Sequence, residues 1–360
     1  MKRTVAAVAA ALLLGAPSRS PADFLSTDLG GLGGPLTIAN SINASGQVVG
    51  LSFLPSGDFH AFLAAGGKIT DLGTLGGFTS TATGINNAGQ IAGYSDVATP
   101  GTVHAFLYSS GTMNDLGTLG GNSSFANSIS PTGVVVGQSD LPGVGFHAFS
   151  YSGGTMHDLG TLGGPTSSAA AANALGQIVG QADLAGGGFH AFLFSGGAMK
   201  DLGTLGGPTS GATGINASGQ VVGWSDVAGG TFHAFSYGGG KMTDLGTLGG
   251  NYSYATAVNA FGQVVGNSLT GKGTFDPFLY TGGRMIDLNS LLPANSPFIF
   301  TSADGINDRG QIIARSSDGR AFLFNGPSAS TAPEPTSLTL LALGGAALAG
   351  CVWRRRAVRG

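Results

Sequence analysis

The sequence predicts an all-β fold of seven four-stranded repeats, arranged as a seven-bladed β-propeller. Three short markers each recur seven times, at intervals of about 43 residues. One is Gly-Gln-Val-Val-Gly or a close variant, and another is His-Ala-Phe, which becomes Asp-Pro-Phe and Arg-Ala-Phe in the last two repeats. The third is an Asp-Leu pair, which begins at Asp28, Asp71, Asp115, Asp158, Asp201, Asp244 and Asp287.

Each repeat contains four short apolar runs separated by turn-forming residues. In residues 82–117 the runs are ATGIN, QIAGYSD, HAFLYSS and TMNDLG, with Asn-Ala-Gly, Thr-Pro-Gly and Ser-Ser-Gly between them. Such runs are typical of strands joined by turns, and four strands in about 43 residues is the length of one propeller blade. The 66 glycines therefore belong largely to a repeat and not to a flexible polymer.

The two ends of the repeat series are complementary. The series begins with a lone strand, Phe24 to Leu29, and it stops after the Arg320-Ala-Phe strand without a fourth strand. Pairing the first strand into the last repeat closes a ring and removes exposed sheet edges. The alternative is an open β-solenoid, but the sequence lacks distinct polar capping repeats.

Most of the repeated residues are interpreted as framework residues, which maintain the fold and bind no ligand. The glycines of Gly-Gln-Val-Val-Gly predict bulges or a close approach of neighbouring blades, and those of Asp-Leu-Gly-Thr-Leu-Gly-Gly predict positive φ in the linkers. The repeated His and Asp, for example His60 and Asp71, are expected to hydrogen-bond neighbouring turns. Imidazoles on separate blades are too far apart to share a metal ion, so no metal or cofactor is expected. A second acidic series predicts Asx turns, with calcium ligation as the alternative, at Asp96, Asp140, Asp183 and Asp226.

The N-terminus has the layout of a cleavable signal peptide. Residues 1–22 contain Lys2 and Arg3, an apolar run from Val5 to Leu14, and small residues up to Ala22. A run of this length is too short to span a bilayer. The alternative is a buried N-terminal helix, but no polar residues are interleaved at helical spacing, which favours export. The repeat domain is then predicted over residues 23–326, followed by a linker at 327–332.

The C-terminus resembles the PEP-CTERM sorting signal of Gram-negative bacteria. An uncharged run from Ser337 to Trp353 predicts a transmembrane helix. It follows the Pro333-Glu334-Pro335 triplet and precedes the Arg354-Arg355-Arg356 cluster. For residues 333–360 the resemblance implies transient anchoring in the membrane, cleavage by an exosortase-type protease and a host that makes exopolysaccharide. A plain membrane anchor is the alternative.

The combination of the three markers resembles the HAF-type extracellular repeat family of bacterial exported proteins. The resemblance covers about residues 24–325 and implies a surface or extracellular location, with no general activity. Between the signal peptide and the C-terminal Arg cluster there are 8 basic and 18 acidic residues, a net charge of −10. This balance disfavours binding to nucleic acid and other polyanions. The single cysteine, Cys351, lies in the C-terminal run, so the repeat domain uses no disulfide.

One repeat position varies while its neighbours do not. It directly follows the Gly-Gln-Val-Val-Gly strand, and its side chains suit a carbohydrate-binding face, because aromatic rings stack on sugars and amides bond hydroxyls. The alternative is an exposed strand end that varies freely. The candidate ligand-binding residues are Tyr94, Gln138, Gln181, Trp224, Asn267 and Arg315, with Leu51 at the same position of the first repeat.

The sequence therefore favours a non-catalytic scaffold or binding module at the cell surface or in the extracellular matrix, with exopolysaccharide as a candidate ligand. No catalytic residue is assigned. The competing function is a propeller-based carbohydrate hydrolase or lyase that uses Asp residues of the last repeat. That repeat holds Asp304, Asp308, Arg309, Arg315, Asp318 and Arg320.

Overall fold

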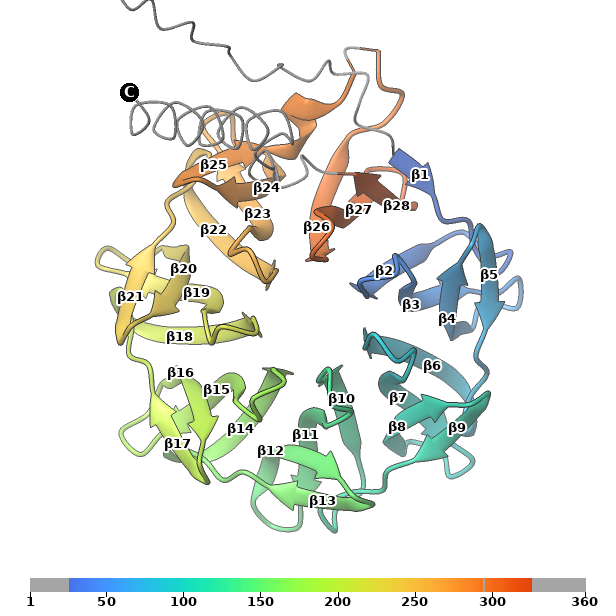
Figure 1. Cartoon of the computed structure of the whole chain (residues 1–360). Coiled ribbons are helices and arrows are strands. Elements are labelled where there is room, and N and C mark those ends of the chain that lie inside the picture. Colours follow the sequence, from blue (N-terminus) through green and yellow to red (C-terminus); the bar gives the residue numbers. More distant parts are fainter. Residues whose placement is uncertain (1–25, 294, 326–360) are drawn as a thin grey trace, which may run out of the picture.

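The computed structural model describes residues 26–293 and 295–325, which form seven four-stranded antiparallel sheets arranged in a ring (Figure 1). The predicted seven-bladed β-propeller is confirmed. The predicted signal peptide (1–22), linker (327–332) and sorting signal (333–360) lie outside the described residues. None of the helices in the described ranges is long and apolar enough to cross a membrane.

Each blade is a four-stranded meander whose strands follow one another from the centre of the ring outward. Blade 1 contains β2 (Thr37–Ile42), β3 (Val48–Phe53), β4 (Phe59–Ala65) and β5 (Lys68–Asp71). Blade 2 contains β6 (Gly76–Ile85), β7 (Ile91–Val97), β8 (Val103–Ser109) and β9 (Thr112–Asp115). Blade 3 contains β10 (Ser124–Ile129), β11 (Val135–Leu141), β12 (Gly145–Ser152) and β13 (Thr155–Asp158). Blade 4 contains β14 (Gly163–Ala172), β15 (Ile178–Leu184), β16 (Phe189–Ser195) and β17 (Ala198–Asp201).

Blade 5 contains β18 (Gly206–Ile215), β19 (Val221–Val227), β20 (Phe232–Gly238) and β21 (Lys241–Asp244). Blade 6 contains β22 (Gly249–Val258), β23 (Val264–Thr270), β24 (Phe275–Thr281) and β25 (Arg284–Asp287), and a short 3-10 helix, η2 (Leu288–Leu291), follows it. Blade 7 contains β26 (Phe300–Ile306), β27 (Gln311–Ser316), β28 (Ala321–Asn325) and β1 (Ser26–Asp28).

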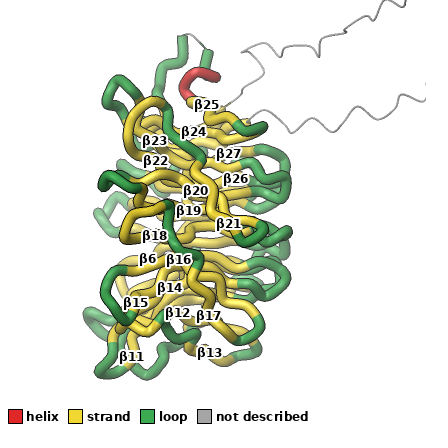
Figure 2. Tube along the Cα trace, turned by 90° about the vertical axis from the view of Figure 1, so that its left-hand side faces the viewer, coloured by secondary structure: helices red, strands yellow, loops and turns green. Residues whose placement is uncertain are grey.

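The ring has two faces of loops, with the strands running between them (Figure 2). Because each blade is an up-and-down meander, the turns between its second and third strands lie on the same face as the linkers to the next blade. We call this the linker face. The Asn-x-x-Gly-Gln turns between the first and second strands lie on the other face, which we call the asparagine face.

The N-terminal strand closes the ring, as the sequence predicts. Strand β1 pairs antiparallel with β28, and Leu29 N donates to Ala321 O at 3.0 Å. The Arg320 guanidinium, which stands where other repeats have His, reaches Asp28 at 2.9 Å. Residues from both ends of the described chain therefore complete blade 7.

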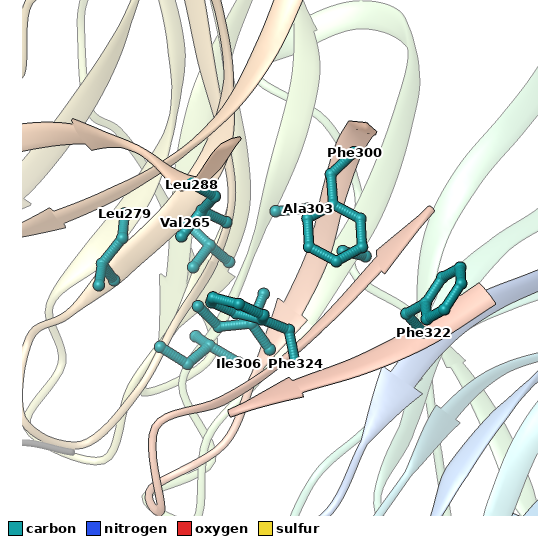
Figure 3. Packing of buried hydrophobic residues seen from close by; sticks show 10 residues of the cluster. Val265, Leu279, Leu288, Phe300, Ala303, Ile306, Phe322 and Phe324 are labelled. Carbon is teal, nitrogen blue, oxygen red and sulfur yellow. The ribbon is translucent and has the colours of Figure 1, made fainter. Parts of the chain in front are cut away.

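The hydrophobic core lies between the blades and not inside any single sheet. The Phe of each His-Ala-Phe marker is inserted between one blade and the preceding one, and six of these rings are fully buried, at 0% exposure. Figure 3 shows the cluster between blades 6 and 7, where Val265 and Leu279 meet Phe300 and Phe324. The fully buried rings are Phe62, Phe106, Phe149, Phe192, Phe235 and Phe278.

The glycines act as predicted in the linkers and in part as predicted in the Gly-Gln-Val-Val-Gly markers. Gly73 and Gly76 have φ of 74° and 105°, so the linker glycines do supply positive φ. The first glycine of the marker approaches a neighbouring blade, since a Cβ on Gly262 would lie 3.1 Å from Gln220 Oε1 of blade 5. The last glycine instead approaches the inner strand of its own blade. A Cβ placed on Gly137 would lie 1.9 Å from Phe125 O, and the bulge is in the inner strand, between Ala126 and Ser128.

In blades 1 to 5 the repeated His and Asp form hydrogen-bonded pairs, and the Asp, as expected, also bonds the turn that follows it. His60 Nδ1 lies 2.9 Å from Asp71, whose Oδ1 also accepts from Gly73 N at 2.8 Å. In blade 6 Asp276 replaces the His. Burial raises the pKa of Asp287, its partner, and the charge of Asp276 raises it further. The other pairs are His104–Asp115, His147–Asp158, His190–Asp201 and His233–Asp244.

The Asx-turn prediction for the second acidic series is wrong. Asp96 Oδ2 accepts from Thr79 N at 3.1 Å and from Thr79 Oγ1 at 2.7 Å, and so ties the second strand to the start of the inner strand. Asp183 and Asp226 make the same two bonds to Thr166 and Thr209. The carboxylates bind residues 17 positions upstream instead of their own loops, because the linker passes beside the end of the second strand.

An asparagine ladder joins the blades around the asparagine face. The side chain of Asn259 donates to Asn307 O at 3.1 Å, and that of Asn307 donates to Asn43 O at 3.0 Å across the closure. Equivalent bonds join six of the seven blade junctions, and the junction after Ser130 lacks one. This ladder makes each turn depend on the next blade.

Candidate ligand-binding face between the blades

The variable residues share one register position in the second strand of every blade. Gln138 on β11, for example, lies between Phe125 on β10 and Ala148 on β12. These residues therefore lie within strands and not at strand ends. Their exposure differs: Gln181 is exposed, whereas Asn267 is only 2% exposed.

Two of the predicted residues meet in one cleft. Gln138 of blade 3 and Gln181 of blade 4 line a space of about 240 Å³ at the linker face, and Phe146 and Phe189 also line it. This volume is below the usual range of drug-sized pockets and fits a unit of the size of one sugar ring. Thr166, Ser167, Ser168, Ala182 and Asp183 complete its lining.

Asp183 is held in a fixed position at the cleft. Its Oδ2 accepts from Thr166 N at 3.1 Å and from Thr166 Oγ1 at 2.7 Å. Among the described residues its Oδ1 has no hydrogen-bond partner. The cleft therefore combines two aromatic rings, two amides and a pre-positioned acceptor, a set that suits a hydroxylated ligand with an apolar face.

Tyr94 and Trp224 do not line this cleft but belong to rows of aromatic contacts. The Tyr94 ring lies 5.2 Å from that of Phe125, in the next blade. The Trp224 ring lies 5.8 Å from that of Phe189, in the preceding blade. Gly211, opposite Trp224 in β18, makes room for this contact, because a Cβ there would lie 3.0 Å from Trp224 Nε1.

Asn267 and Arg315 lie at the junction of blades 6 and 7, away from the cleft. Asn267 Oδ1 accepts from Ala303 N at 3.2 Å, which makes this amide part of the blade interface. Burial raises the pKa of Tyr254 beside it, and the charge of Asp304 raises it further. The structure therefore does not bring all six candidate residues into one site.

The charged residues of the last repeat are likewise separated. Asp304 lines the central channel, where the seven inner strands enclose about 240 Å³, and Asp308 lines a smaller pocket on the asparagine face. Asp318 and Arg320 form an exposed ion pair at 2.8 Å, next to the closing strand. Asp304, Asp308 and the Asp318–Arg320 pair therefore lie in three different places of the described structure.

Burial raises the pKa of Asp304, whereas Ser302 and Arg315 lower it. The ionised carboxylate is therefore disfavoured in the folded state. The resulting loss of folding stability grows as the pH rises above the ordinary Asp pKa of about 3.9. Asp304 occupies the register position of Asn40, whose amide donates to Ala82 O of the next blade at 2.8 Å.

Replacing Asp304 by asparagine is therefore expected to stabilise the protein by about 1 kcal/mol at pH 7, and by little at pH 3. Denaturant unfolding of both proteins at the two pH values measures this. Equal stability of variant and wild type at pH 7 would show that the buried Asp304 carboxylate does not destabilise the folded protein.

Sequence reasoning missed the aromatic residues of the cleft, Phe146 and Phe189. Each stands directly before a His-Ala-Phe marker, a position that is Phe in five of the seven repeats. This recurrence was a usable signal. A cleft between two blades depends on the residues of both, so the sequence of a single repeat does not predict where one forms.

Comparison with known proteins identifies the C-terminal segment. Residues 331–356 match the PEP-CTERM protein-sorting motif. The chain carries an export and sorting signal. This confirms the predicted PEP-CTERM motif, whereas the transmembrane helix and the resemblance of the repeats to the HAF family remain predictions. No curated protein matches the chain in sequence.

Solved structures resemble this chain at low sequence identity, among them two with TM-scores above 0.5. The β-propeller domain of the Trilobed protease from Pyrococcus furiosus is 8% identical, with a TM-score of 0.54 over 84% of this chain and 97% of that one. The puromycin-hydrolyzing peptidase of Mycobacterium tuberculosis is 13% identical, with a TM-score of 0.51 over 84% and 55%. TolB from Acinetobacter baumannii is 14% identical, with a TM-score of 0.45 over 78% and 64%. The chain thus spans less than two thirds of the last two proteins.

Proposed function

We propose that the protein is a non-catalytic glycan-binding module of the cell surface or extracellular matrix, with exopolysaccharide as its ligand. The observation that carries this proposal is the cleft between blades 3 and 4. There Gln138 and Gln181, two residues of the variable position, face the same space as Phe146 and Phe189. The framework residues recur in nearly every blade, so variation at this position is where a ligand would be selected.

The sorting motif supports the proposed location. A PEP-CTERM protein is exported and sorted, and we propose that an exosortase-type protease cleaves this chain near Pro333-Glu334-Pro335. The C-terminal run would then anchor the protein in the membrane only until cleavage. The released propeller would reach the surface, where polysaccharide is the abundant hydroxylated polymer.

Retention on immobilised polysaccharides tests the proposal. We expect the purified protein to bind at least one member of a panel of α-glucan, β-glucan and alginate. The double variant Gln138→Ala/Gln181→Ala should bind at least about tenfold more weakly, because hydrogen bonds that together contribute about 1.4 kcal/mol are lost.

Leu51→Ala is the matched control, since Leu51 has the same register position but lies outside the cleft. It should bind like the wild type. If the double variant is retained as well as this control, the cleft is not the binding site.

The same incubations test the competing hydrolase or lyase. Asp304 is its best candidate residue, because it lines the channel and its pKa is raised by burial. Release of reducing ends that Asp304→Asn abolishes would establish an enzyme and overturn the non-catalytic proposal.

A further inference from the structure

Aromatic rings extend from both sides of the cleft along the linker face. On one side Tyr94, Phe125 and Phe146 follow one another, with ring centroids 5.2 and 5.9 Å apart. On the other side Phe189, Trp224, Phe232 and Tyr252 follow at 5.8, 5.9 and 4.9 Å. The cleft itself lies between Phe146 and Phe189. We call these seven rings the aromatic track.

The track has a consistent position in the fold. Its rings come from blades 2 to 6, from the linker-face ends of the first and third strands and from the variable position of the second strand. All seven side chains remain partly exposed, whereas the framework Phe rings of the same blades are fully buried. The aromatic track is thus distinct from the core.

We propose that the aromatic track binds an extended, uncharged polysaccharide chain, laid along the linker face with one sugar unit in the cleft. This rests on the proposed function and specifies its ligand. Partly exposed rings give successive sugars an apolar surface, and Gln138 and Gln181 bind the hydroxyl groups of the central unit.

The charges of the site favour an uncharged chain. No Lys or Arg is among the residues that line the cleft or form the aromatic track, and Asp183 places a carboxylate in the cleft. A polyanion would meet this carboxylate with no cation to balance it, in a protein whose exported part is acidic. Arg315 lies elsewhere, at the junction of blades 6 and 7.

An extended site predicts that affinity depends on chain length. Binding of the intact protein is measured by calorimetry with neutral glucan oligosaccharides, from a monosaccharide to an octasaccharide. We expect affinity to rise by at least about a hundredfold along this series, because each added unit contacts further rings. Trp224→Leu, which keeps an apolar side chain of moderate size but removes the stacking surface, should weaken binding of the octasaccharide about tenfold and leave the monosaccharide unaffected.

Tyr108→Leu is the control, since Tyr108 is a partly buried aromatic residue of blade 2 that lies outside the track. Its thermal unfolding, compared with that of Trp224→Leu, separates lost binding from lost folding. Equal affinity for short and long chains, unchanged by Trp224→Leu, would overturn the extended site but leave the cleft intact. Retention on alginate alone would also overturn it, whereas retention on no polysaccharide of the panel would overturn the proposed function itself.

Discussion

Replacing Gly137 by alanine is expected to lower the free energy of unfolding by about 3 kcal/mol or more. Gly137 faces the carbonyl of Phe125 on the neighbouring strand, and an added Cβ would lie 1.9 Å from that oxygen and 2.8 Å from Ala126 Cα. These are backbone atoms of the same sheet, so the clash can be relieved only by moving a strand that also packs on blade 2. Overpacking of this kind usually costs about 1–3 kcal/mol, and more where the backbone must shift.

Gly238→Ala is the matched control. Gly238 is also a strand glycine, at the end of β20, but a Cβ there meets nothing within 4 Å and its φ is not positive. Its replacement should change stability by less than about 0.5 kcal/mol. Urea unfolding of both variants measures the difference, and equal stabilities would show that the second strand tolerates a side chain at Gly137.

The repeat count, the four strands and the ring closure could all be predicted from the sequence. They follow from periodic residues whose requirements are local, such as the positive φ of Gly73, and from the missing strand after Phe322. The His60–Asp71 pair was also within reach, because both residues recur at a fixed offset. Periodicity therefore determined the number of blades and the strands of each blade.

What the sequence could not supply is which residues meet across neighbouring strands and between blades. The bonds from Asp96 to Thr79 were missed because the two residues are far apart in sequence and meet only when the linker folds back. Gly137 was expected to mark a bulge or a close approach of neighbouring blades, and it instead approaches the inner strand of its own blade. The variable position was recognised correctly as one register, but its seven members face different neighbours. Only two of them, Gln138 and Gln181, share a cleft.

The asparagine ladder is the other feature with a large expected effect. Asn259 is 3% exposed and makes four hydrogen bonds: its amide donates to Gln263 Oε1 and Asn307 O, and its Oδ1 accepts from Phe261 N and Gln263 N. Gln263 is itself only 5% exposed, so water cannot easily replace these bonds. An unsatisfied buried polar group costs about 1–3 kcal/mol.

Asn259→Ala is therefore expected to destabilise the protein by about 3 kcal/mol. The control variant is Asn259→Ser, because serine occupies this position in another blade. Blade 3 has Ser130 at this position, and its hydroxyl accepts from Val134 N at 3.0 Å, in place of the Asn oxygen. Asn259→Ser should recover that bond and cost about half as much as the alanine. Urea unfolding of the two variants tests the ladder, and an alanine variant as stable as the serine variant would contradict it. Because each amide bonds the next blade, loss at Asn259 should loosen the junction with blade 7 and leave the cleft between blades 3 and 4 competent to bind.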